Sequence, residues 1–224
     1  MRVIGLTGGI GMGKSTAAAC FRRARIPVFD ADAAVHALQR RGGRAVRPIA
    51  ASFPGTVRDG VIDRAALRAA VMREPGALQR LERIVHPLVR AAERAFLGRA
   101  RRAGARAVVL DVPLLFETGG ERRADFTIVV SAPRAVQAAR LRLRRQWNQA
   151  EIDAAIARQM SDAEKRRRAN LVVRTGLSRY HALRALRRLI LELQTCPAPC
   201  CSILKRRGLI PPRVTGSSRS PRSN

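Results

Sequence analysis

Residues 1–20 read MRVIGLTGGIGMGKSTAAAC, and residues 8–15 within them have the full spacing G-x-x-x-x-G-K-S. A short apolar run over residues 2–7 precedes the glycines, and a helix-favouring stretch follows from Ser15. This succession of strand, glycine loop and helix turns backbone N–H groups toward a phosphate, which the helix N-terminus also faces. The stretch therefore predicts a phosphate-binding loop. Its spacing is not G-x-G-x-x-G, so a dinucleotide-binding loop is not predicted.

Two side chains at the end of this loop have expected roles in phosphate chemistry. Lys14 is expected to reach the β- and γ-phosphates of a nucleotide, and Ser15 is expected to offer its hydroxyl to Mg²⁺. The alternative is a glycine-rich turn with an incidental lysine. That alternative does not account for the strand before the loop and the helix after it.

Five short strands separated by helical stretches are expected along the chain, at residues 2–7, 27–30, 107–111, 125–130 and 171–173. Such alternation is typical of a parallel sheet covered by helices. We therefore predict an α/β protein with the P-loop NTPase fold, in which a five-stranded parallel sheet is flanked by helices. The expected nucleotide-binding core consists of residues 1–32 and 105–194.

Two helical segments interrupt this alternation. Residues 33–104 are mostly helical and too long for an ordinary crossover, so we expect an inserted helical substrate subdomain. Breaks in it are expected at Gly42-Gly43, Pro54-Gly55, Asp59-Gly60, Pro75-Gly76 and His86-Pro87. Residues of about 140–168 are helical and charged, which favours a mobile lid.

The composition bounds the class of protein. The chain has 224 residues and a formal net charge of +28, and 46% of its residues are hydrophobic. Disorder throughout is excluded because this much apolar surface can be buried. The charge indicates a nucleic acid, an anionic membrane or a polyanionic small molecule as partner. Only three basic residues are lysines, so much of the charge is attributed to arginine on solvated helix surfaces.

Location and redox state follow from similar counts. No apolar run approaches the roughly 18 residues that a membrane helix needs, and Lys14 interrupts any export signal. The four cysteines form no zinc-binding pattern, so we expect a reduced, cytoplasmic protein. Residues 195–224 are rich in Pro, Ser and Arg and lack periodicity. They are expected to form a disordered basic tail.

Acidic residues lie where strands are expected to end. Asp30 and Asp32 follow the second strand, at the edge of a parallel sheet where ligands bind. Asp32 is expected to accept a proton from a substrate hydroxyl or to hold Mg²⁺ through water. Either aspartate can instead cap the helix that begins near Ala33, an alternative that weighs more for Asp30. Asp111 closes the third strand and is a candidate Mg²⁺ ligand.

Further along, Gln137, Arg140 and Arg144 share one face of a helix through their i, i+3 and i+7 spacing. Arginines on a lid can stabilise the charge on a transferring phosphoryl group. In a chain so rich in arginine, surface decoration is the alternative. His86 precedes Pro87 and is interpreted as a polar residue at a helix entry.

Taken in order, these segments resemble the dephospho-coenzyme A kinase family over Val3 to about Gly176. The matching segments are IGLTGGIGMGKST, IPVFDADAAVH, DGVIDRAALR, LERIVHPLVR, VLDVPLLFETG, QAARLRLR and ARQMSDAEKRRRA. The resemblance implies transfer of the ATP γ-phosphoryl group to the ribose 3′-hydroxyl of dephospho-CoA. This reaction gives ADP and CoA and is the last step of CoA biosynthesis.

The resemblance also implies roles for single residues. Asp32, Lys14 and Arg140 are the expected catalytic residues, with Asp32 as base, and Ser15 and Asp111 the expected Mg²⁺ ligands. Asp32 and His86 are expected to contact dephospho-CoA. ATP is expected to be held by Gly11, Met12, Gly13, Lys14, Ser15, Thr16 and Arg144.

Two positions differ from the family pattern. Asn170 stands where the family has Asp after Ala, and Arg174 stands near a position that is commonly Asn. Both are expected near the loop on the adenine side, away from the chemistry. The tail, residues 195–224, has no counterpart in the family pattern.

Two other functions share some of these features. Another P-loop small-molecule kinase, with a nucleoside, nucleotide or shikimate-like acceptor, has the same loop. A basic nucleic-acid-binding module fits the charge, but aromatic residues make up only 4% of the chain and no helix-turn-helix or zinc-finger pattern is found. The expected partners are therefore ATP and dephospho-CoA, without specific nucleic acid or membrane. A monomer is expected.

Overall fold

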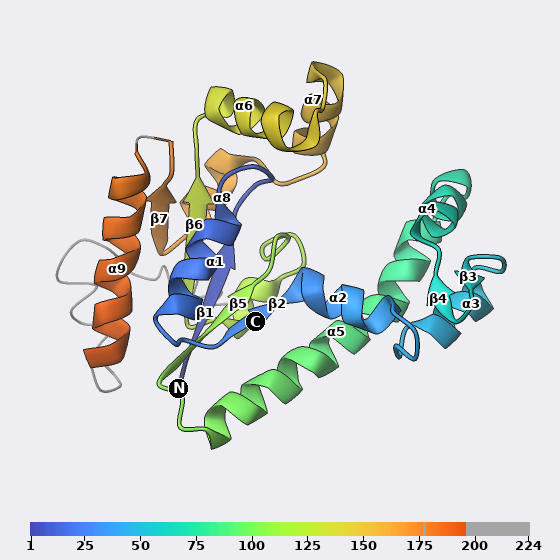
Figure 1. The fold of residues 1–224 in the computed structure, drawn as a ribbon, viewed down its shortest axis with the longest axis horizontal. Coiled ribbons are helices and arrows are strands. Elements are labelled where there is room, and N and C mark those ends of the chain that lie inside the picture. The colour runs from blue at the N-terminus through green and yellow to red at the C-terminus, as the bar shows by residue number, and fades with distance from the viewer. Residues whose placement is uncertain (177, 196–224) are drawn as a thin grey trace, which may run out of the picture.

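The computed structural model describes residues 1–176 and 178–195. Its main sheet has five parallel strands in the order β2-β5-β1-β6-β7 (Figure 1). The strands are β1 (Arg2–Thr7), β2 (Val28–Asp30), β5 (Ala107–Asp111), β6 (Phe126–Ser131) and β7 (Leu171–Arg174). The predicted five-stranded parallel sheet is confirmed. The expected tail lies outside the described residues, except for Thr195 at the end of the last helix.

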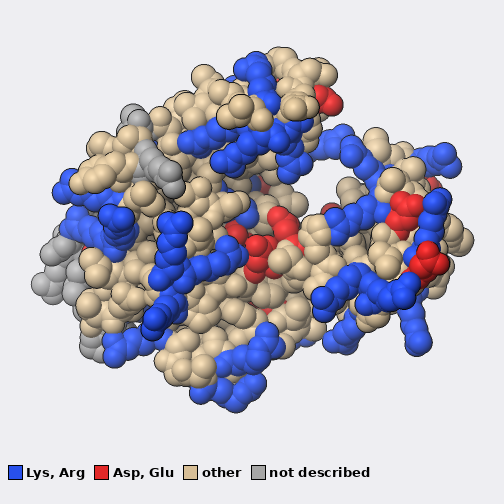
Figure 2. Space-filling view, viewed as in Figure 1, with Lys and Arg blue, Asp and Glu red and all other residues tan. Residues whose placement is uncertain are grey.

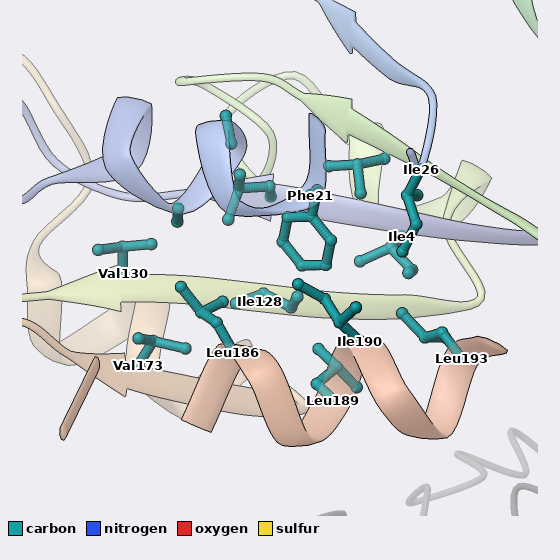
Figure 3. Close-up of a cluster of buried hydrophobic side chains, with 14 of the residues drawn as sticks. Ile4, Phe21, Ile26, Ile128, Val130, Val173, Leu186, Leu189, Ile190 and Leu193 are labelled. Atoms are coloured by element: carbon teal, nitrogen blue, oxygen red, sulfur yellow. The ribbon is translucent and has the colours of Figure 1, made fainter. Parts of the chain in front are cut away.

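Both faces of the sheet are buried because its strands are apolar on both sides. One face is covered by α1 (Lys14–Arg23) and α9 (Arg179–Thr195). Figure 3 shows Phe21 of α1 and Leu186 of α9 packed with Ile128 of the sheet. This core fixes the strand, loop and helix that carry the glycine motif.

The opposite face is covered by the C-terminal half of α5 (Ala77–Arg102). Phe96 of this helix packs against Phe29 of β2, with ring centroids 5.6 Å apart. Val108 and Leu110 of β5 lie in the same apolar cluster. In the sheet, β5 lies between β1 and β2. Because α5 packs on β2 and β5, it lies close to the ends of β1 and β2.

The insertion projects away from the sheet (Figure 1). It consists of α2 (Ala31–Gln39), α3 (Val46–Ser52), β3 (Val57–Arg58), β4 (Val61–Ile62), α4 (Arg64–Arg73) and the N-terminal half of α5. Ile49, Phe53 and Leu67 are buried in a separate apolar core there. Since α5 is continuous, it packs into this core at one end and onto the sheet at the other.

Two details of the insertion differ from the prediction. The expected break at His86-Pro87 is wrong, because α5 continues through Pro87. An internal proline costs about 3 kcal/mol, and the packing of α5 at both ends offsets that cost. Asp59-Gly60 is the turn of an antiparallel hairpin between β3 and β4, with positive φ at both residues, so the subdomain is not wholly helical.

The expected lid region holds three helices, α6 (Arg134–Arg145), α7 (Gln149–Ala157) and α8 (Asp162–Arg168). We call residues 134–168 the lid. Its small core combines Leu141 and Ile152 with Ile10 of the glycine loop. In residues 1–176 and 178–195, no helix combines the length and the apolar character that crossing a bilayer requires.

Candidate active site

The glycine loop joins β1 to α1 at the carboxyl edge of the sheet, as predicted. Gly13 has φ 97°, a left-handed conformation that favours glycine, and a Cβ at Gly8 would lie 2.5 Å from the Val130 carbonyl oxygen. In the described part of the chain, no side chain caps the N-terminus of α1. Its first N–H groups are therefore available to an anion.

Lys14 reaches across to the neighbouring strand. Its Nζ donates a hydrogen bond to Asp111 Oδ1 at 2.6 Å. Asp111 is 3% exposed, and burial raises the pKa of its carboxyl group while the Lys14 charge opposes that rise. The register of the parallel strands places Asp111 beside Asp30. The pair holds the Lys14 ammonium at the head of the glycine loop.

A cavity of about 690 Å³ opens beside this pair. It is bounded by the glycine loop, α2, α5, the loop after β5 and the lid. It brings together the predicted residues Lys14, Ser15, Asp32, His86 and Arg144. Figure 2 shows acidic side chains in the hollow between the core and the insertion, with basic side chains on both sides of it.

The two aspartates after β2 have different surroundings. Asp30 is the N-cap of α2, and its Oδ1 accepts a hydrogen bond from the Ala33 N–H at 3.0 Å. Asp32 lies in the first turn of α2, is exposed and lines the cavity. Among the described residues, its carboxylate has no hydrogen-bond partner. The capping alternative therefore holds for Asp30 and not for Asp32.

A second, smaller cavity of about 560 Å³ lies next to the first one. Ser15, Asp32 and Asp111 line it together with Asp30. A hydroxyl and several carboxylates are oxygen ligands of the kind that Mg²⁺ prefers, so the donor set fits this ion. Thr16 is exposed in the first turn of α1.

The two lid arginines are placed differently from each other. Arg144 lines the large cavity. Arg140 Nη1 donates to the Gly11 carbonyl at 3.3 Å, and Arg140 Nη2 donates to the Thr175 carbonyl at 2.8 Å. In this arrangement Arg140 supports the loop from outside, and Arg144 faces the cavity. The shared helix face was predicted, but the split between its two arginines was not.

His86 lines the cavity from within α5. Its interpretation as a residue at a helix entry is wrong, because the helix begins at Ala77.

Sequence reasoning missed an ion pair in the cavity wall. Glu93 of α5 is 4% exposed and accepts a hydrogen bond from Arg123 Nε at 2.9 Å. Arg123 ends the 3₁₀ helix η1 (Gly120–Arg123), so the pair ties α5 to the loop after β5. Glu93 follows Val89 by four residues and therefore lies on the same apolar face of the helix. A carboxylate on an apolar helix face is a sequence signal for a buried ion pair.

A buried lysine fixes the same loop from the lid side. The Lys165 side chain is 1% exposed, and its Nζ lies 2.8 Å from Glu117 Oε1 and 3.2 Å from the Pro113 carbonyl oxygen. Pro113 also accepts a hydrogen bond from Thr7 Oγ1 at 2.8 Å. Lys165 therefore joins α8 to the cavity wall and to the end of β1.

We predict that Lys165→Met lowers the free energy of unfolding by about 2–3 kcal/mol, because it leaves Glu117 without its cation and Pro113 without one donor. Urea unfolding followed by circular dichroism measures the change. The matched control is Arg167→Met on the same helix, because the Arg167 side chain is 77% exposed in its ion pair with Glu164 and a loss of about 0.5 kcal/mol or less is expected. Equal losses in the two variants would contradict this role of Lys165.

The two positions that differ from the family pattern lie at opposite ends of β7. Asn170 precedes the strand, and its Oδ1 accepts hydrogen bonds from Thr127 N at 2.8 Å and Thr127 Oγ1 at 2.9 Å. Its expected place near the nucleotide loop is therefore wrong, because it lies at the amino end of the strands. Arg174 ends β7 at the carboxyl edge and is exposed there.

Comparison with known proteins identifies the family. The family described as dephospho-CoA kinase matches residues 2–178. The chain belongs to the dephospho-CoA kinase family. It is 61% identical over 166 residues to a dephospho-CoA kinase of Paramagnetospirillum magneticum. These residues cover 74% of this chain and 78% of that relative. It is 50% identical to a dephospho-CoA kinase of Gluconobacter oxydans, over 87% of this chain and 98% of that relative.

Solved structures agree with this family fold. Protein TT1252 of Thermus thermophilus is 37% identical, with a TM-score of 0.74 over 86% of this chain and 97% of its own. The dephospho-CoA kinase of Campylobacter jejuni is 22% identical, with a TM-score of 0.66 over 85% of this chain and 96% of its own. The second likeness concerns the fold alone.

Proposed function

We propose that the chain transfers the γ-phosphoryl group of ATP to the 3′-hydroxyl of the ribose of dephospho-CoA, giving ADP and CoA. The observation that carries the proposal is the 690 Å³ cavity, which joins the glycine loop to the insertion and has Asp32 on its wall. A cavity of this size suits a ligand of drug or cofactor size. Membership of the family supports the choice of dephospho-CoA as acceptor.

The proposed mechanism depends on positioning and charge. ATP phosphates lie against residues 11–16, with the N–H groups of Gly11, Gly13, Lys14 and Ser15 as donors, since the other two donate to loop carbonyls. Lys14 exchanges Asp111 for the β- and γ-phosphates. Asp32 accepts the proton of the acceptor hydroxyl as that oxygen attacks the γ-phosphorus in line. Arg144 on the lid offsets the negative charge of the transferred group. Arg140 can contact the transferred phosphoryl group only if its guanidinium group leaves the Gly11 and Thr175 carbonyls.

Magnesium is part of the proposal. Ser15, with Asp111 or Asp32, would hold Mg²⁺ together with phosphate oxygens, and the ion would neutralise charge on the phosphates. Only oxygen ligands are needed for this ion, and the smaller cavity offers a hydroxyl and carboxylates.

The acceptor is proposed to bind along the insertion. His86 and the apolar residues of the cavity wall belong to α2 and α5. These residues are Val35, Leu81, Val85 and Val89. An apolar wall suits the pantetheine arm of dephospho-CoA better than it suits a small polar acceptor such as shikimate.

An acceptor screen tests this choice. Purified full-length protein with ATP and Mg²⁺ is expected to form ADP much faster with dephospho-CoA than with adenosine, AMP or shikimate, at equal concentrations. A pyruvate kinase and lactate dehydrogenase coupled assay measures the rates. Equal or faster ADP formation with another acceptor would favour the second kinase hypothesis.

We also propose an oligomeric state, a class of partner and a location for the reaction. We propose that the protein acts as a monomer. The positive charge is proposed to serve two polyanionic small molecules rather than a specific nucleic acid or a membrane. We place the reaction in the cytoplasm, where ATP is available and Cys20 stays a free thiol.

A further inference from the structure

The outer side of the glycine loop is held by side chains from outside the loop. Three successive carbonyl groups, those of Ile10, Gly11 and Met12, each accept a hydrogen bond. Gln137 Nε2 donates to Ile10 O at 2.7 Å, Arg140 Nη1 donates to Gly11 O at 3.3 Å, and Thr175 Oγ1 donates to Met12 O at 2.7 Å. No residue of the donor set lies in the phosphate-binding sequence itself.

These donors also bind one another. Arg140 Nη1 donates to Thr175 Oγ1 at 3.1 Å, so the arginine and the threonine form one unit. Gln137 is 3% exposed, and it lies one turn before Arg140 on α6. The unit therefore joins the lid, the end of β7 and the loop.

The middle of the loop is anchored further in the lid. The Ile10 N–H donates to Gln159 Oε1 at 3.0 Å, and the Ile10 side chain packs against the lid core of Ala138, Leu141 and Ile152. Ile10 thus has both of its backbone groups and its side chain bound to the lid. Movement of the lid cannot leave this loop residue unaffected.

The hydrogen bonds to the loop carbonyls also fix the direction of the loop N–H groups, which are the groups that bind phosphate. In a trans peptide, the carbonyl of one residue and the N–H of the next point in opposite directions. Carbonyls held toward α6 and β7 therefore turn the N–H groups of Gly11 and Gly13 toward the other side of the loop. This arrangement also keeps carbonyl oxygens, which repel anions, away from the phosphates.

We propose that Gln137, Arg140, Thr175 and Gln159 are positioning residues that orient the glycine loop for ATP and couple it to the lid. They act through the backbone groups of residues 10–12 and need no contact with ATP. The inference rests on the proposed use of this loop for ATP, so ATP binding is measured without acceptor. A failure of phosphoryl transfer then remains distinguishable from a failure of loop positioning.

Thr175 offers the sharpest test because valine has nearly the shape of threonine without its hydroxyl. Thr175→Val is expected to weaken ATP binding about tenfold in an equilibrium titration of the full chain, since the Met12 carbonyl and Arg140 each lose a partner. The KM for dephospho-CoA is expected to change less than twofold. In ATP-free protein, peptides covering residues 8–14 are expected to exchange hydrogen faster in Thr175→Val than in the parent chain.

Two variants separate positioning from a general loss of structure. Thr175→Ser retains the hydroxyl and is expected to bind ATP within threefold of the parent chain. Thr195→Val removes a hydroxyl that donates to the Leu191 carbonyl on α9, and it is expected to leave ATP affinity unchanged. Gln159→Met is the second route if Thr175→Val does not fold, because Gln159 is only half-buried and binds the Ile10 N–H. It is also expected to weaken ATP binding and to speed exchange in residues 8–14.

The proposal is overturned if Thr175→Val binds ATP as tightly as the parent chain with unchanged exchange in the loop. It is also overturned if Thr175→Ser is as weak as Thr175→Val, or if the KM for dephospho-CoA rises as much as the Kd for ATP. An unchanged Kd for ATP in Gln159→Met would also overturn the proposal.

Discussion

Asp32→Asn is expected to lower kcat by about 10³-fold while the Kd for ATP stays within about threefold. A positioned general base contributes roughly 10²–10⁴-fold, and asparagine retains the shape of the side chain without its basicity. Asp32 lines the cavity beside Lys14 and Ser15, and it is exposed at the first turn of α2. Steady-state assays with ATP and dephospho-CoA measure kcat, and a nucleotide titration measures Kd.

Asp30→Asn is the matched control for this variant. Asp30 is two residues away on the same segment, but its carboxylate caps α2 and pairs with Arg22 at 3.3 Å. Asparagine also caps helices, so the change is expected to cost less than about 1 kcal/mol of stability and to lower kcat less than about tenfold. If both variants lose the same activity, or if Asp32→Asn retains most of its rate, Asp32 is not the base.

Lys14→Met is expected to reduce kcat/KM for ATP by at least about 10³-fold. The variant removes the cation proposed to contact the β- and γ-phosphates, and methionine retains most of the length of the side chain without its charge. It also leaves the Asp111 carboxylate buried without its ion-pair partner. Lost activity alone would therefore not separate catalysis from stability.

The pH dependence of unfolding separates these effects. Burial raises the pKa of Asp111 above the ordinary value of 3.8, and Lys14 opposes this rise, so removing Lys14 raises that pKa further. Above about pH 4 the unfolded chain loses this proton before the folded chain does. The stability of Lys14→Met, relative to the parent chain, is thus expected to fall as pH rises from about 4 and to level off above the raised pKa.

The double variant Lys14→Met/Asp111→Asn is the decisive control. Asparagine carries no charge at any pH, so most of the stability lost at pH 7, about 2–3 kcal/mol, is expected to return. Activity is expected to stay low because the phosphates still lack the lysine. Urea unfolding at pH 4 and pH 7 measures stability. Recovered activity in the double variant would show that Lys14 acts only by neutralising Asp111.

The parts of the fold that were predicted depend on local signals. The glycine loop has a required spacing, and the five strands are short apolar runs that alternate with helices. The covering of both faces by helices then follows from the parallel arrangement. The order of the strands was not predicted and comes from the structure alone. The sequence favoured a cap more for Asp30 than for Asp32, and the structure shows that Asp30 is the cap of α2.

The parts that were missed depend on contacts distant in sequence. Pro87 predicts the end of a helix locally, but α5 continues because the insertion and the sheet bind its two halves. The hairpin at Asp59-Gly60 had a local signal that was interpreted only as a break. Helical spacing placed Gln137 and Arg140 on one face, yet it carried no information about the loop carbonyls that they bind.

³¹P NMR of the reaction mixture tests whether this chain phosphorylates the ribose 3′-hydroxyl of dephospho-CoA. With ATP, Mg²⁺ and dephospho-CoA, one new phosphomonoester signal that coincides with authentic CoA is expected. This signal should grow as the γ-phosphate signal of ATP declines, and it should be absent with Asp32→Asn over the same time. Growth of inorganic phosphate alone, or of a phosphomonoester at another position, would show that the chain does not carry out this transfer.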